Sequence, residues 1–193
     1  MFMKTNKLAV FISGKGTNAL NLISFFKNSK NTKIGLIFST KENNILQKTC
    51  ADKKIAFHFS DKKGEELELE QTQFLHLYQI TFIVLAGYLK KISKSLIELY
   101  SNQIINLHPS LLPKHGGKGM YGKYVHQAVL DAKETYSGIT IHYVNKKYDQ
   151  GRMIAQYSVD IDSNETLESL EKKIHDLELL YLPIVLVSIL KEK

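Results

Sequence analysis

The chain has 193 residues, of which 44% are hydrophobic and 23% charged, and this composition predicts one globular domain, residues 1–193, with a full-sized core. Its single cysteine, Cys50, excludes an intrachain disulfide and fits a reducing compartment. The net charge is +7, but the lysines are spread along the chain and form no nucleic-acid-binding signature. We therefore expect a basic surface that attracts small anions rather than nucleic acid.

The apolar runs are too short to indicate a membrane span. The longest, Leu179 to Leu190, is twelve residues and contains Pro183, which favours a buried helix. The first, Leu8 to Ile12, soon meets Gly14 and lacks the features of a secretory signal. We expect no membrane partner and a cytoplasmic protein.

Strand and helix signals alternate through the first half of the chain. The apolar run Leu8–Ser13 predicts a strand buried on both faces, followed by a glycine turn and a helix over about 18–26. Further strands are predicted at 34–39, 55–59, 82–86 and 104–107, with helices over 45–52, 65–78 and 93–100. This alternation is typical of an α/β fold with a mostly parallel central sheet and helices on both faces.

The pattern changes in the second half. Gly138–Tyr143 and Arg152–Asp160 are extended stretches joined by a turn over 146–151, which predicts an antiparallel hairpin at the sheet edge. A long helix is predicted from about Thr166. In such folds ligands bind beyond the carboxyl ends of the parallel strands.

The most informative motif lies at the end of the fifth predicted strand, in Asn106-Leu107-His108-Pro109. Side chains at i and i+2 of an extended segment share a face, so Asn106 and His108 point toward one small volume. A carboxamide donor beside a titratable ring suits acyl-type transfer. The alternative is that Asn106 caps a turn and His108 binds a backbone carbonyl.

A second motif, Gly14-Lys15-Gly16-Thr17-Asn18, lies between the first strand and its helix. Glycines let the backbone approach a ligand, and free amides at a helix start attract phosphate. The spacing matches neither a P-loop nor a complete GxGxxG motif. Phosphate binding and an ordinary tight turn both remain open from these residues.

Two further features lie near the Asn-His motif in a folded chain. Asp149, in the turn of the late hairpin, is placed to approach His108 and raise its pKa, although it might only begin that turn. Four glycines within Gly116–Gly122 suit either a loop that closes over a ligand or a flexible connection. The remaining histidines lack metal-ligand spacing, so we expect no metal.

Together these motifs resemble the phosphoribosylglycinamide formyltransferases, a branch of the formyltransferase superfamily. The matching elements are Ile12–Asn18, Leu85–Tyr88, Asn106–Pro113 and Gly138–Val144 leading to Tyr148-Asp149-Gln150-Gly151. They occur in the family's order over roughly residues 8 to 183. The Asn-x-His-Pro-Ser-Leu-Leu-Pro element with a later Asp-x-Gly is specific for the superfamily.

The resemblance implies a Rossmann-like formyltransferase fold and the transfer of a formyl group in purine biosynthesis. The formyl group of 10-formyltetrahydrofolate, the co-substrate, would pass to the amine of 5'-phosphoribosylglycinamide by direct amine attack. Asn106 would donate to the oxyanion, His108 would handle protons, and Asp149 would position His108 and raise its pKa.

The resemblance also implies two binding regions and no partner beyond these small molecules, in a monomer or homodimer. The ribonucleotide would contact Gly16, Thr17, Asn18 and Glu178. The folate would contact Lys63, Leu89, Lys90, Lys91, Ile92, Asn106 and Val144. Many members carry an arginine in the region of Lys63, and the lysine lacks its bidentate geometry.

Two other functions compete with this one. A methionyl-tRNA formyltransferase shares the Asn-His-Asp set, but that family usually adds a C-terminal tRNA-binding domain, whereas this sequence ends in a predicted helix. A non-catalytic nucleotide-binding module would require Asn106, His108 and Asp149 to be incidental. A turnover assay after a binding titration distinguishes a binder from an enzyme.

Overall fold

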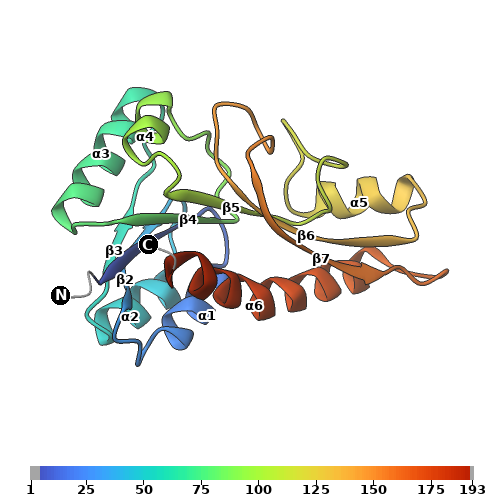
Figure 1. Ribbon diagram of the computed structural model, residues 1–193, viewed down its shortest axis with the longest axis horizontal. Coiled ribbons are helices and arrows are strands. Elements are labelled where there is room, and N and C mark those ends of the chain that lie inside the picture. Colours follow the sequence, from blue (N-terminus) through green and yellow to red (C-terminus); the bar gives the residue numbers. More distant parts are fainter. Residues whose placement is uncertain (1–4, 192–193) are drawn as a thin grey trace. The chain divides into compact units, whose positions relative to one another are not determined.

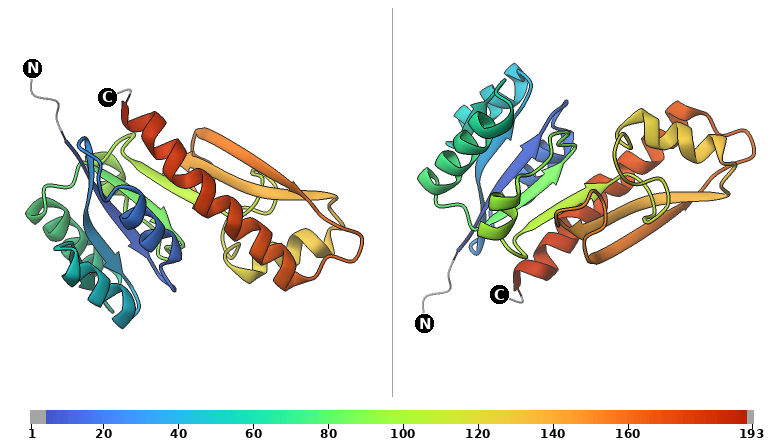
Figure 2. Two further views of the ribbon diagram at one scale, coloured as in Figure 1. Left: turned by 90° about the horizontal axis from the view of Figure 1, so that it is seen from below. Right: turned by 90° about the horizontal axis from the view of Figure 1, so that it is seen from above.

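The computed structural model describes residues 5–191, which form seven strands and six helices. The chain forms two compact units, which divide between Ile104 and Ile105. Figures 1 and 2 show the ribbon of the chain. No helix within the described residues is long and apolar enough to cross a membrane.

The first unit is a parallel α/β structure. Its strands β1 (Asn6–Ile12), β2 (Thr32–Ser39), β3 (Ala56–Phe59) and β4 (Phe82–Ala86) are parallel and lie in the order β3-β2-β1-β4. Helices α1 (Thr17–Phe25) and α2 (Asn44–Asp52) cover one face, while α3 (Gly64–Leu77) and α4 (Lys94–Leu99) cover the other (Figure 1). The predicted alternation of strands and helices is therefore confirmed.

The core of this unit forms around β1, whose side chains from Leu8 to Ile12 are fully buried. The Phe11 ring lies 4.9 Å from that of Phe38 and 5.3 Å from that of Tyr88, measured between ring centroids. On α2, Cys50 is also fully buried. Burial raises the pKa of its thiol to about 11, so the thiol stays protonated near neutral pH.

The second unit contains the antiparallel strands. Strands β5 (Ile104–His108), β6 (Tyr136–Tyr143) and β7 (Met153–Asp160) lie in the order β5-β6-β7, and both pairings are antiparallel. The predicted hairpin is β6 with β7. Helix α6 (Leu167–Lys191) packs against both of these strands and against α5 (Lys123–Asp131).

Within the described residues, helix α5 is the one element that the sequence pattern did not predict. It follows the glycine-rich loop and begins after Gly122, so the loop composition obscured the start of the helix. Its buried face is formed by Val125, His126 and Val129. The i, i+4 spacing of the two valines was the signal available for this helix.

Candidate active site

Three predicted residues meet in the second unit. Asn106 and His108 lie on β5, and Asp149 lies in the segment that joins β6 to β7. The Asn106 amide nitrogen donates to Asp149 Oδ1 at 3.3 Å, and His108 Nδ1 lies 3.6 Å from the same oxygen. One carboxylate oxygen therefore contacts both the carboxamide and the imidazole.

His142 is a fourth member of this cluster and was not among the predicted site residues. It pairs with Asn106 across β5 and β6. Its Nδ1 donates to the Tyr143 carbonyl at 2.9 Å, which leaves Nε2 to accept from the Asn106 amide at 3.1 Å. The position of His142 beside Asn106 depends on the register of β5 and β6. The sequence pattern does not give this register, so the contact could not be predicted from it.

His108 is almost completely buried, with 4% of its side chain exposed. Its Nε2 donates to the His115 carbonyl at 2.9 Å, so Nδ1 faces Asp149 with its lone pair free to take a proton. Burial lowers the pKa of His108, and this effect outweighs the negative charge of Asp149, which raises it. Asp149 thus raises the pKa of His108, as expected, but burial brings the resulting pKa below the ordinary value of a histidine.

Asp149 stays ionised at neutral pH. Burial raises its pKa, but the nearby imidazoles of His142 and His108 and the hydrogen bond from the Gly117 amide together lower it. The Gly117 amide donates to Asp149 Oδ2 at 2.8 Å. The predicted glycine-rich loop therefore contacts the carboxylate directly.

Glu178 on α6 lies in the electrostatic environment of the cluster. Burial lowers the pKa of His108 and that of the buried His126, and the negative charge of Glu178 acts on both in the opposite direction. Glu178 Oε2 lies 3.3 Å from Nδ1 of His175. The structure thus places Glu178 in the same unit as the three predicted catalytic residues.

The glycine turn of the first unit is closely packed and hydrogen-bonded. Gly16 has φ +73° and caps the start of α1, with Thr17 and the buried Asn18 in its first turn. A Cβ atom at Gly16 would lie 2.9 Å from the Leu46 side chain. The Asn43 amide braces the turn by donating to the carbonyls of Gly14 and Lys15, at 3.3 and 3.0 Å.

The segment 87–92 is tied to the end of β1. The Ser13 hydroxyl accepts from the Leu89 amide at 3.0 Å and lies 2.6 Å from the Thr40 hydroxyl. Among the predicted folate contacts, Lys63, Leu89, Lys90 and Lys91 are exposed, Val144 is half-buried, and the Ile92 side chain is 4% exposed. The Ile92 side chain therefore has little exposed surface with which to contact a ligand.

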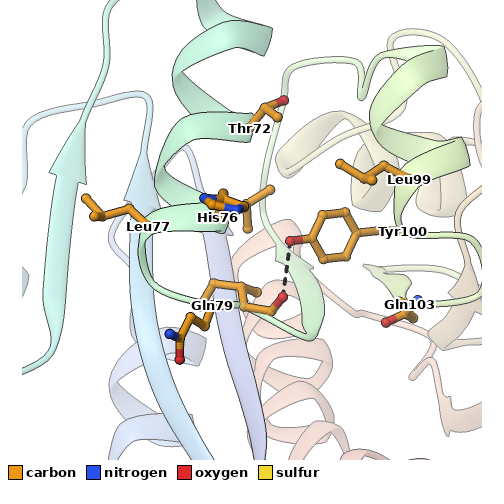
Figure 3. Close-up of a pocket in the computed structure, with 9 residues that line it drawn as sticks. Thr72, His76, Leu77, Gln79, Leu99, Tyr100 and Gln103 are labelled. Atoms are coloured by element: carbon orange, nitrogen blue, oxygen red, sulfur yellow. Dashed lines mark hydrogen bonds between the residues drawn. The ribbon is translucent and has the colours of Figure 1, made fainter.

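A cavity of about 620 Å³ lies in the first unit, between the carboxyl ends of α3 and α4 (Figure 3). Across it the Tyr100 hydroxyl donates to the Ile80 carbonyl at 3.1 Å. The cavity is lined by Thr72, Leu75, His76, Leu77, Gln79, Ile80, Leu99, Tyr100 and Gln103. None of these residues belongs to the predicted binding regions. Within residues 5–191, no group of three or more potential ligands is arranged to hold a metal ion.

The family model described as "Formyl transferase" matches residues 6–186. The chain belongs to the formyl transferase family. A chloroplastic phosphoribosylglycinamide formyltransferase of Arabidopsis thaliana is 37% identical over 94% of this chain, and that of Bacillus subtilis is 34% identical over 95% of this chain and 94% of its own length. The chain spans 65% of the Arabidopsis relative and 57% of a second plant relative.

The structural comparison gives the same family. The phosphoribosylglycinamide formyltransferase of Bacillus halodurans superposes with a TM-score of 0.87 at 33% identity, covering 96% of this chain and 95% of that protein. The predicted family and its Rossmann-like formyltransferase fold are therefore confirmed.

Proposed function

We propose that this formyl transferase carries the formyl group of 10-formyltetrahydrofolate to the amine of 5'-phosphoribosylglycinamide. The observation that carries the proposal is the contact of Asn106 and His108 with the single oxygen Oδ1 of the ionised Asp149. This geometry joins a hydrogen-bond donor, a proton acceptor and a carboxylate that stabilises the protonated imidazole. The names of the relatives favour this acceptor over methionyl-tRNA.

The reaction forms one bond and breaks one. The amine nitrogen attacks the formyl carbon, and the carbonyl oxygen becomes an oxyanion that accepts from the Asn106 amide. His108 Nδ1 takes the proton that the amine loses, with Asp149 3.6 Å away to stabilise the positive charge. The carbon–N10 bond then breaks, and the proton passes to N10, which gives tetrahydrofolate and the N-formyl product.

In the absence of substrate, the Asn106 amide donates hydrogen bonds within the cluster. Its nitrogen donates to both His142 and Asp149, so both of its hydrogens are engaged. An oxyanion must replace one of these acceptors. The two partners hold the amide in place until the negative charge develops.

We propose that the substrates bind in the two predicted regions. Gly16, Thr17 and Asn18 contact the ribonucleotide, since amides at a helix start attract a phosphate. Glu178 is a further proposed contact of the ribonucleotide. Leu89, Lys90, Lys91, Ile92, Val144 and Asn106 contact the folate, and Lys63 supplies a positive charge without bidentate geometry. The protein acts in the cytoplasm on these small molecules, as one domain in a monomer or homodimer.

The test is a spectrophotometric assay with 10-formyldideazafolate and 5'-phosphoribosylglycinamide, run beside the variant His108→Ala. Amine-dependent transfer by the wild type that is lost in the variant supports the reaction and the role of His108. A folded wild type that transfers nothing contradicts the proposal, and formylation of methionyl-tRNA is then the next assay.

A further inference from the structure

The segment Lys114–Gly117 supplies one backbone hydrogen bond to each of two catalytic groups. The His115 carbonyl accepts from His108 Nε2 at 2.9 Å, and the Gly117 amide donates to Asp149 Oδ2 at 2.8 Å. The orientation of the imidazole and that of the carboxylate therefore both depend on where this short loop segment lies.

The segment is held in an unfavourable backbone conformation. His115 has φ +52°, in the left-handed region that side-chain-bearing residues rarely adopt. Such a residue persists only where its surroundings hold it in place. The Ser110 hydroxyl does so in part, because it donates to the Lys114 carbonyl at 3.0 Å.

Glu134, which lies between α5 and β6, contacts two side chains of the segment, those of Lys114 and His115. Lys114 Nζ lies 3.0 Å from each carboxylate oxygen of Glu134, and His115 Nε2 lies 3.3 Å from Oε1. Only 19% of the Glu134 side chain and 16% of the His115 side chain are exposed. This partial burial shields the contact between them from solvent better than an open surface ion pair.

We propose that Glu134 is a positioning residue for formyl transfer, which holds Lys114 and His115 so that the backbone of this segment orients His108 and Asp149. The inference rests on the proposed function, since it assigns the orientation of groups that act in that reaction. Without Glu134 the left-handed residue is free to relax, and its carbonyl moves away from His108. The imidazole then loses its fixed orientation, whereas the substrate-binding residues keep theirs.

Several charged and polar groups near His108 determine the pKa of its ring. Asp149, Glu178 and the His115 carbonyl raise the His108 pKa, while burial and the charge of His142 lower it, and His126 lies nearby. Of these, the contact with the His115 carbonyl and the position of Asp149, which accepts from the Gly117 amide, depend on the segment that Glu134 holds. Loss of Glu134 should therefore lower the His108 pKa.

The experiment compares the wild type with Glu134→Ala, Glu134→Gln and the control Lys172→Met. Lys172 forms an exposed ion pair with Asp176 on α6, so its loss removes a surface charge pair elsewhere in the same unit. We expect Glu134→Ala to lower the NMR-measured His108 pKa by about half a unit and kcat by about tenfold, with both KM values within about twofold. Glu134→Gln should recover most of both losses, because the amide oxygen still accepts from Lys114 and His115.

Several outcomes would overturn the inference. Unchanged titration and kcat in Glu134→Ala contradict it, as does an equal loss in Lys172→Met. If Glu134→Ala fails to fold, His115→Asn replaces it, since asparagine tolerates the left-handed backbone but is too short to reach Glu134. The titration needs no turnover, so it decides the role of Glu134 even if the wild type transfers no formyl group and the proposed function fails.

Discussion

At the residue scale, the Asn106 amide has the most direct consequence for the reaction. Losing one oxyanion donor costs about 2.7–4 kcal/mol of transition-state stabilisation. We expect Asn106→Ala to lower turnover about 100-fold or more while the melting temperature stays close to that of the wild type. Steady-state kinetics and calorimetry measure the two effects, and near-normal turnover would exclude Asn106 from the mechanism.

The charge of the Asp149 carboxylate should affect how the activity depends on pH. Its negative charge raises the pKa of His108, so the neutral variant Asp149→Asn should lower that pKa further. Protonation of His108 removes the base, and the acid limb of the kcat/KM profile therefore moves to lower pH, with lower turnover on the plateau. An acid limb at the wild-type pH would show that Asp149 does not act on His108.

The sequence was sufficient to place Asn106 and His108 on one face, because the two-residue period of a strand decides it. It was not sufficient to show that His142 joins them, since that contact depends on the β5–β6 register. The lowered pKa of His108 also escaped prediction, because it results from burial by residues distant in sequence.

At the element scale, the turn before α1 offers a matched pair of glycines. A Cβ atom at Gly16 meets Leu46 and Ile12 in a left-handed backbone, whereas one at Gly14 meets nothing within 4 Å. We expect Gly16→Ala to lower the melting temperature by about 2–8 °C and to weaken ribonucleotide binding, while Gly14→Ala changes neither by much. Thermal unfolding measures the melting temperatures of the two variants, and isothermal titration measures their affinities for the ribonucleotide. Equal values for Gly16→Ala and Gly14→Ala would contradict this prediction.

The elements themselves were predicted unevenly, for a physical reason. β1 and β4 were evident because their side chains are buried without interruption, and such runs have few alternatives. Helix α5 was missed because only a narrow part of its surface is buried, and four glycines lie just before it.

At the scale of the whole molecule, the net charge of +7 acts on both proposed substrates, which are anions. Raising the salt concentration from about 0.05 M to about 0.5 M should increase KM for the ribonucleotide roughly threefold and leave kcat unchanged. A KM that does not change with salt concentration would show that the surface charge does not contribute to substrate binding. Viscosity controls separate this effect from slower diffusion.

The fully buried Cys50 gives the protein a built-in reporter of its own unfolding. Its sole thiol is protonated and inaccessible in the folded first unit, so a disulfide reagent such as dithionitrobenzoate reacts only when α2 opens. The rate of colour release then measures how often this unit opens, without any engineered label. Comparing that rate with and without each substrate would show which of them stabilises the first unit.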